Sequence, residues 1–405
     1  MKKNILIFIL PLLLCSCGDK LQENAGRMEF VSLSDIKVDD DFWLPYFYIH
    51  KDVTLPICIS WAESHIDSSL VSKAVEGIGY SLQFEKDPEL SAQRASLITS
   101  LKSQSGIHQP SPDSCDVSAS VSRIFSDARY LKMTGDGKYA DDLEQTMLNR
   151  VLPCVSLKGD RFFSYSPTSS EGGYQRQSIE DNPAAAMELF RALPSVGNYV
   201  YGTSKDALWV NLYMGGDAGM KVAGEDIVVH QSTSYPWDGD VVLQLELKRP
   251  VKTDIRLRIP SWCKDYTLTV NDSAIEKAIM NAGYVVLTRK WRDGDKIELI
   301  LDMPVEVVDS GLLGEIEAGK RILKRGPLVY CIEEADNPES FDTLFLSDGL
   351  EYRLDKLPKK EWWGHELMRI SAQLSESRSL ILIPYFAWGN RAPGKMAVFI
   401  PYHAD

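Results

Sequence analysis

Cysteine is the residue type in this chain that could both attack a substrate and bind a metal, because its thiolate is a strong nucleophile and a soft ligand. Two of the seven cysteines, Cys15 and Cys17, lie in an apolar N-terminal segment, and the others are Cys58, Cys115, Cys154, Cys263 and Cys331. These five are widely spaced and contain no C-x-x-C pair, so the sequence indicates neither a disulfide framework nor a zinc ribbon. For most of them we expect the role of a small buried apolar residue.

The N-terminal segment predicts export. Lys2 and Lys3 precede an apolar run, residues 5–14, which is too short to span a bilayer as a mature helix and has the layout of a secretory signal. The run ends in "LCSC", residues 14–17, which looks like a bacterial lipoprotein signal. We expect residues 1–17 to be a lipoprotein signal peptide with Cys17 lipidated, which gives a cell-envelope protein anchored on the periplasmic face or outer surface. The alternative is an ordinary signal peptide that happens to contain cysteines.

Composition limits the partners. The 405 residues have room for about two or three domains, and 44% hydrophobic with 25% charged residues is typical of globular cores. The formal net charge of −13 argues against a nucleic-acid partner, since phosphate binding needs clustered Lys and Arg. A neutral substrate fits this charge better.

The elements before residue 200 are predicted to be helical. Apolar residues recur at helical spacing in two stripes, Val117, Val121, Ile124, Ala128 and Leu131, then Tyr139, Leu143, Met147 and Val151. Between them "TGDGK", residues 134–138, has the composition of a tight turn. Further on, Asn182 is expected to cap a helix that begins at Pro183.

After residue 200 the apolar period becomes two. Short alternating strands are predicted at 208–212, 241–247, 255–259, 266–270, 284–288 and 297–301, and more within 320–334 and 379–401. This spacing is typical of β-sandwiches. We expect residues from about 205 to 405 to form an independent all-β unit.

Seven motifs in this order resemble glycoside hydrolase family 127, the β-L-arabinofuranosidase-like family of six-hairpin glycosidases. They are "SLSDIKVDDDFWLP", "MTGDGKYADDLEQTMLNRVL", "VGNYVYGTSKDALWVNLYMG", "YPWDGDV", "LRIPSWC", "KRGPLVYCIEEADNP" and "IPYFAWGNRAPGKMAVFIP". The resemblance implies a multidomain α + β fold, an (α/α)6-type helical barrel followed by antiparallel β-sandwich domains. It places a catalytic domain at 28–203 and β-sandwich domains at 204–310 and 311–405.

The resemblance also implies a retaining hydrolase with a zinc-bound cysteine nucleophile and a Glu acid/base. In the family, the nucleophile opens a Cys-Cys-Pro-Pro-Asn run before the helix that here reads "DNPAAAMELFRAL". An ungapped match puts the cysteine pair on Ala184 and Ala185, and a short insertion puts it on Asp181 and Asn182. Neither match supplies a thiolate.

The implied zinc site is partly present. "DSCD", residues 113–116, matches the family's Glu-x-Cys ligand pair, with Asp113 and Cys115 as a remnant. Two ligands do not make a tetrahedral site, which takes three or four protein groups. We therefore expect no cofactor, although zinc is the family's metal. The alternative roles are a helix N-cap for Asp113 and a core position for Cys115.

The catalytic domain is also short. The segments at 80–106 and 108–115 nearly touch, where the family places several more barrel helices and the acid/base Glu. A closed barrel needs twelve helices, and residues 42–200 have room for about five or six. We expect a truncated barrel.

Three functions remain open. A glycosidase with altered chemistry would use a carboxylate pair, with weak catalytic candidates Glu171, Glu180 and Asp181 beside Asp113 and Asp116. A non-catalytic glycan-binding or structural lipoprotein could stack sugars on Trp362, Trp363, Tyr385, Phe386 and Trp388, although aromatic residues more often fill cores. The third is an internally deleted gene copy. We expect a lipoprotein that acts on or binds L-arabinofuranose-type plant glycans with impaired or absent catalysis, and partners limited to a glycan and the membrane.

Overall fold

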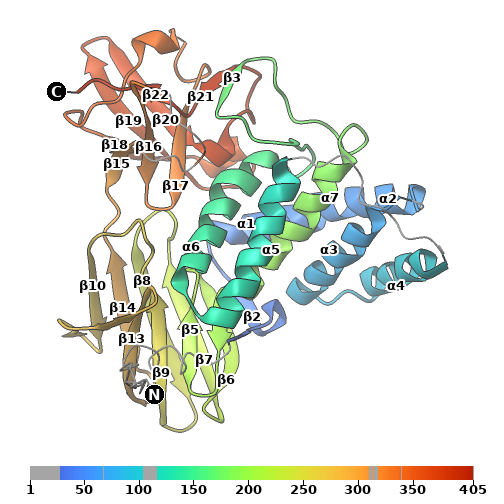
Figure 1. Ribbon diagram of the computed structural model, residues 1–405, viewed down its shortest axis with the longest axis vertical. Helices are drawn as coiled ribbons and strands as arrows, with labels where there is room; N and C mark the ends of the chain where they lie inside the picture. Colours follow the sequence, from blue (N-terminus) through green and yellow to red (C-terminus); the bar gives the residue numbers. More distant parts are fainter. Residues whose placement is uncertain are drawn as a thin grey trace, which may run out of the picture.

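The structure is a computed structural model, and it describes residues 28–66, 68–103, 116–309, 313, 318–338 and 340–404. Helices occupy the N-terminal part, and mostly antiparallel sheets form the rest (Figure 1). This confirms the predicted fold class. Cys17, Asp113 and Cys115 lie outside the described residues, as does the side chain of Asp116.

The helical region contains seven α-helices among the described residues. They are α1 (Trp43–Ile49), α2 (Leu55–Ser64), α3 (Val71–Phe84), α4 (Pro88–Ser103), α5 (Asp116–Thr134), α6 (Gly137–Thr146) and α7 (Pro183–Ala192). A π turn at His50–Thr54 joins α1 to α2, and another at Met147–Val151 extends α6. If α1 and α2 are taken as one continuous helical segment, the described helices agree with the five or six that the sequence predicts.

The hairpin of α5 and α6 forms as the apolar stripes predict. All five stripe residues of α5 are buried, from Val117 to Leu131. Gly135 has a φ of 64° in the connecting turn, a left-handed conformation that glycine adopts without strain. Asp136 then caps α6, because its Oδ1 accepts a hydrogen bond from the Lys138 amide at 3.1 Å.

The helices pack in an open row instead of a closed barrel. In the described part of the chain, α4 packs on α3, α3 on α7, α7 on α5, and α5 on α6. In Figure 1, α4 forms the outer end of this row and α6 lies against the sheets. Close contact between α3 and α7 depends on Gly77, where a Cβ atom would lie 2.6 Å from the Phe190 ring.

The middle β domain contains two sheets. The six-stranded sheet has the order β1 (Glu29–Phe30), β4 (Tyr201–Thr203), β5 (Ala207–Val210), β9 (Val251–Arg258), β13 (Tyr284–Trp291), β12 (Ile279–Asn281). The seven-stranded sheet has the order β11 (Ser273–Ala274), β10 (Tyr266–Val270), β14 (Lys296–Leu301), β8 (Asp240–Leu247), β7 (Glu225–Thr233), β6 (Gly216–Val222), β2 (Ile36–Val38). Alternate residues of β8, from Val241 to Leu247, are buried, as the period of two predicts.

The C-terminal domain is built on a third sheet. Its main path is β15 (Val305–Val308), β16 (Lys320–Arg325), β17 (Leu328–Glu333), β20 (Arg378–Pro384), β19 (Leu367–Ser375), β18 (Arg353–Leu357). Two short strands extend it, β21 (Lys395–Ala397) on β17 and β22 (Ile400–Pro401) on β16. A strand from the helical region, β3 (Ser169–Glu171), pairs with β21 (Figure 1).

The sheets include strands that precede residue 205, so independent folding of the β unit from about residue 205 stays a prediction. Strands β1 and β2, from the start of the chain, form one edge of each sheet of the middle domain, and β4 precedes residue 205. A fragment that began at residue 205 would lose all three strands and would expose new sheet edges. The sheets therefore cross the expected boundary between residues 203 and 204.

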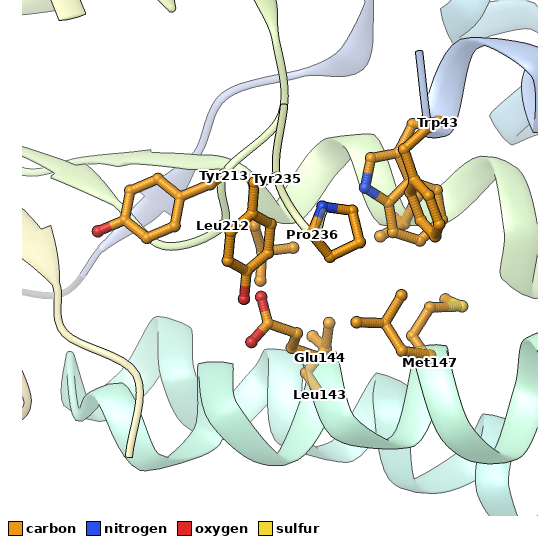
Figure 2. A pocket seen from close by; sticks show the side chains of 11 residues that line it. Trp43, Leu143, Glu144, Met147, Leu212, Tyr213, Tyr235 and Pro236 are labelled. Atoms are coloured by element: carbon orange, nitrogen blue, oxygen red, sulfur yellow. The ribbon is translucent and has the colours of Figure 1, made fainter. Parts of the chain in front are cut away.

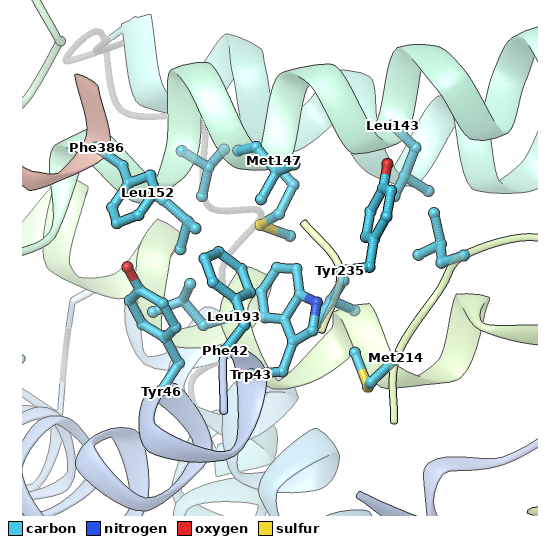
Figure 3. Packing of buried hydrophobic residues seen from close by; sticks show 14 of the residues in the cluster. Phe42, Trp43, Tyr46, Leu143, Met147, Leu152, Leu193, Met214, Tyr235 and Phe386 are labelled. Carbon is cyan, nitrogen blue, oxygen red and sulfur yellow. The ribbon is translucent and has the colours of Figure 1, made fainter. Parts of the chain in front are cut away.

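The helical region, the middle β domain and the C-terminal domain also share one hydrophobic core. The Phe42 ring lies 5.6 Å from the Trp237 ring of the middle domain and 5.7 Å from the Phe386 ring of the C-terminal domain, measured between centroids. Figure 3 shows Phe42 and Trp43 within this cluster, between Tyr235 and Phe386. Edge-to-face ring pairs of this kind stabilise beyond the area that they bury.

Cys58, Cys154, Cys263 and Cys331 are buried, as expected of structural cysteines. Within the described ranges, no helix has the length and apolar character needed to cross a bilayer.

Candidate active site

The positions that match the family's nucleophile lie at the start of α7. The helix begins at Pro183 as predicted, and Asn182 occupies the N-cap position. The expected cap bond is absent, however, since the Asn182 side chain makes no capping hydrogen bond and its Nδ2 is buried without a partner among the described residues. The preceding turn is instead held by Ser178, whose Oγ donates to Asp181 Oδ2 at 2.7 Å.

This helix start offers no nucleophile. Ala185 is fully buried and Ala184 is half-buried, and a methyl group has no lone pair with which to attack an anomeric carbon or bind a metal. Among the residues that the structure describes, no three His, Cys, Asp or Glu side chains come together as a metal site. The residues at the start of α7 therefore do not fit the family's zinc.

The predicted carboxylates do not converge. Glu171 is exposed in β3, where Lys395 Nζ lies 2.9 Å from its Oε2. Glu180 and Asp181 are adjacent and exposed in the turn before α7. A glycosidase acid/base needs a raised pKa, which burial or a neighbouring carboxylate would supply. None of the three lines the cavities described below.

One buried carboxylate near this position was missed. Glu188 lies one helical turn after Ala184, with 1% of its side chain exposed. Its Oε1 accepts hydrogen bonds from Ser118 Oγ of α5 at 2.6 Å and from Lys73 Nζ of α3 at 2.7 Å. Arg191 donates to its Oε2 at 2.9 Å. An acidic residue on the buried face of "AAAMELF" was the signal that could have identified it.

The charge of Glu188 follows from these contacts. Burial alone would raise its pKa, but the hydrogen bonds from Lys73 and Ser118 and the charge of Arg191 outweigh burial and lower it. Glu188 is therefore ionised at neutral pH and has no proton to give to a leaving group. Its hydrogen bonds connect α7 to α3 and α5, so we assign it a structural role.

A second buried charge cluster joins α6 to β9. The Arg258 side chain is fully buried; its Nη1 donates to Asp141 and its Nη2 to Glu144 Oε1, the latter at 2.6 Å. Burial lowers the pKa of Arg258, but the charges of Glu144 and Asp141 outweigh burial and raise it. Tyr213 also donates its hydroxyl to the Arg258 carbonyl. The "LRIPSWC" motif thus contributes a structural ion pair.

A small apolar cavity lies beside this cluster. Figure 2 shows Glu144 facing Tyr235 across it, with Trp43, Met147 and Leu212 along its walls. Its volume is about 10 Å³, which is about the space of one water molecule. Sugar sites need several hundred cubic ångströms, so this cavity is not a substrate site.

Two open cavities are large enough for a sugar. One, of about 400 Å³, lies between α3, α5 and α7, where Arg191 pairs with Glu76 at 2.8 Å beside Tyr80 and Phe125. The other, of about 410 Å³, lies between residues 156–176 and the C-terminal domain. Neither is lined by Ala184 or Ala185.

Most of the aromatic candidates belong to the core. Trp362, Tyr385, Phe386 and Trp388 are each at most 2% exposed. Trp363 is half-buried and lines the cavity of about 410 Å³, with Lys158 Nζ 5.0 Å from its ring centroid. The sequence-based expectation that several of these residues fill the interior is confirmed.

Sequence profiles of one family match three successive parts of the chain. The profile described as the β-L-arabinofuranosidase GH127 catalytic domain matches residues 107–190, the GH127 middle domain matches 207–303, and the glycoside hydrolase family 127 C-terminal domain matches 305–401. A curated relative, the non-reducing end β-L-arabinofuranosidase of Bifidobacterium longum, is 28% identical over 324 residues. That match covers 69% of this chain and 48% of the relative, so the chain spans about half of its length.

Solved structures show the same fold. The GH127 β-arabinofuranosidase BT3674 has a TM-score of 0.81 at 19% identity, over 93% of this chain and 98% of its own. A GH127 β-L-arabinofuranosidase from Geobacillus stearothermophilus T6 has a TM-score of 0.65 at 27% identity, over 82% of this chain and 59% of its own. The first solved chain is covered almost from end to end, so the shortened helical region has a structural counterpart. The motifs, the profiles and the fold agree: this chain belongs to glycoside hydrolase family 127.

Proposed function

We propose that this protein is a cell-envelope lipoprotein that recognises L-arabinofuranose-type plant glycans and hydrolyses them poorly or not at all. The observation that carries the proposal is the start of α7, where Ala184 and Ala185 stand at the ungapped positions of the family's cysteine pair. The names of the relatives supply the sugar class, since both B. longum and G. stearothermophilus proteins are β-L-arabinofuranosidases.

Loss of a covalent nucleophile has a large effect on rate. Mutant series on nucleophilic enzymes place the cost at several orders of magnitude. A replacement mechanism would need two carboxyl groups on either side of the scissile bond, about 5 to 10 Å apart. Glu171, Glu180 and Asp181 are exposed, and Glu188 is already bonded to Ser118, Lys73 and Arg191. Binding without efficient turnover agrees best with these contacts.

The packing of the shortened barrel favours a working fold over a damaged gene copy. A random internal deletion would leave apolar helix faces without partners. Here α3 and α5 both pack on α7, and the buried Glu188 of α7 is bonded to Lys73 of α3 and Ser118 of α5. A solved family member also has a helical region that this chain matches over nearly its whole length.

The lipid anchor is part of the proposal. It is supported by Lys2 and Lys3 before the apolar run and by the "LCSC" order that ends at Cys17. Cells grown with labelled palmitate should label the wild-type protein and leave Cys17→Ala unlabelled. Equal labelling of both proteins would remove the anchor from the proposal.

Glycan recognition is tested by isothermal titration calorimetry, in which arabinofuranose oligosaccharides are added to the purified chain from residue 18. We expect saturable binding and no loss of oligosaccharide over the experiment. A matched titration with a xylose oligosaccharide of equal length controls for nonspecific sugar binding. No binding, or equal binding of both sugars, would contradict the proposed specificity.

A further inference from the structure

The cavity of about 410 Å³ between residues 156–176 and the C-terminal domain has its own chemistry. We call it the basic pocket, and the residues that define it are Lys158, Arg161, Tyr174, Arg176, Trp363 and Trp388. It does not include Ala184 or Ala185, which match the family's nucleophile positions. Its walls come from two parts of the chain that are far apart in sequence, so the fold itself assembles it.

Three cations line this pocket with little opposing charge. Lys158, Arg161 and Arg176 make no ion pair with any carboxylate in the described part of the chain. Arg391, a fourth cation in the lining, is already paired with Asp336 and with Glu333, the latter at 2.5 Å. Asp160 is the acidic residue in the lining, and it accepts a hydrogen bond from Ser156 Oγ at 3.0 Å. The pocket is therefore locally positive on a chain of net charge −13.

Arg176 is the deepest of these cations. It is 8% exposed and is held by two carbonyl groups, with Nη1 donating to Trp388 O at 2.9 Å and Nη2 to Pro153 O at 2.7 Å. Burial lowers the pKa of Arg176 to about 10, so it remains charged at neutral pH. The charge of Glu333 and the Phe163 ring, 4.4 Å from the guanidinium, offset part of the cost of burying this cation, and an anion in the pocket would offset more of it.

Two buried donors in the pocket also lack acceptors. Arg176 Nε and the Trp388 indole Nε1 have no hydrogen-bond partner among the described residues. Both groups can only donate. Both atoms are covered by neighbouring groups, so they lie behind the wall of the cavity, and a ligand would reach them only after these side chains shift.

The aromatic rings give the pocket apolar surface as well. Trp363 is half-buried, and Tyr174 stacks on Phe163 with 4.5 Å between ring centroids. Rings with a few convergent polar groups are typical of small-molecule sites. A sugar ring presents both an apolar face and hydroxyl oxygens, and an acidic group on it would meet the cations.

We propose that the basic pocket binds an anionic saccharide, a sugar residue that carries a carboxylate or a sulfate group. The exposed Lys158 and Arg161 would bind its acidic group, and Arg176 behind them would add positive charge to the pocket. The ligand differs from the neutral substrate that net charge alone suggested. The site does not depend on turnover or on arabinofuranose binding, so either proposal can fail alone.

The test uses calorimetric titration of the purified chain with four probes. These are a galacturonate trisaccharide, its methyl ester, a sulfated galactose disaccharide and a neutral arabinofuranose trisaccharide. Lys158→Ala/Arg161→Ala removes two exposed cations of the pocket, so folding should be unaffected. Lys248→Ala/Lys290→Ala removes two exposed cations from the middle domain and serves as the matched control.

We expect an anionic probe to bind, with an affinity that falls as salt is raised. The methyl ester should bind at least about tenfold more weakly than the free acid, the pocket variant should lose at least about tenfold in affinity, and the control variant should match wild type. Preference for the carboxylated or the sulfated probe would identify the acidic group. Equal affinity for acid and ester, unchanged affinity in the pocket variant, or no binding of either anionic probe would overturn the proposal.

Discussion

The junction between α6 and β9 and the start of α7 both lie within family 127 sequence, and they differ in what their side chains do. At the junction, Arg258 is fully buried and is bonded to Asp141 and Glu144. At the start of α7, Ala184 and Ala185 present methyl groups at the positions that an ungapped match gives to the family's cysteine pair. The difference teaches that the motifs that reveal the family here encode the scaffold. We therefore expect that family membership does not carry the family's chemistry with it in this chain.

The largest predicted effect comes from the junction. Arg258→Ala would leave Glu144 buried without its cation, and breaking a buried pair in this way costs about 3–5 kcal/mol. Chemical denaturation should show a large fall in the free energy of unfolding. Lys290→Ala, an exposed change on the neighbouring strand β13, should behave like wild type. A loss below about 1 kcal/mol for Arg258→Ala would show that the junction is not a main source of stability.

Acid should destabilise the fold through two buried histidines, one packed on α7 and one in the C-terminal domain. Burial lowers the pKa of His50 to about 3 and that of His365 to about 4, against an ordinary value of 6.5. His50 stacks on Phe190 of α7, and His365 donates a hydrogen bond from its Nε2 to the Leu157 carbonyl oxygen, 3.0 Å away. Both are neutral in the folded state and gain a proton in the unfolded state below pH 6.5.

The unfolded state therefore binds more protons, and stability falls as pH drops from about 6.5 towards 4. Each histidine contributes at most about 1.4 kcal/mol per pH unit. Melting temperatures measured between pH 7 and 4.5 should show this decline, and His365→Gln should flatten it. A wild-type profile that is level over this range would contradict the assignment of neutral buried histidines.

Glu188 offers a smaller test of the α7 region. Glu188→Gln removes the charge that Lys73 and Arg191 share, and we expect a loss of about 1–3 kcal/mol, as for hydrogen bonds to charged groups. Glu180→Gln, in the exposed turn before the same helix, is the control and should be close to neutral. If Glu188→Gln matched its control in stability, Glu188 would not be a structural link.

Sequence reasoning identified the long periodic elements and missed what depends on distant contacts. The stripe from Val117 to Leu131 and the alternation in β8 predicted α5 and β8, because burial on one face imposes a period. Strands β1 and β2 have two and three residues, too few to show a period, and they form by pairing with β4 and β6.

The residues of the candidate site also fall into those that sequence patterns identify and those that depend on distant contacts. Asn182 was placed correctly at the helix start, but whether its side chain caps depends on local geometry that sequence does not reveal. Glu188 and Arg176 were not singled out in the sequence, and the partners that surround them in the fold lie on segments far away in sequence. Pockets built between such segments cannot be seen in a single sequence.

The most direct test of the central claim is a combined measurement of zinc content and L-arabinose release on the purified chain from residue 18. With alanines at 184 and 185, we predict well under one zinc per chain and no release from an aryl β-L-arabinofuranoside above a buffer blank. Turnover that survives Cys115→Ser but falls with Glu180→Gln or Asp181→Asn would indicate a carboxylate mechanism. Stoichiometric zinc together with turnover that Cys115→Ser abolishes would contradict the claim and restore the family's cysteine chemistry.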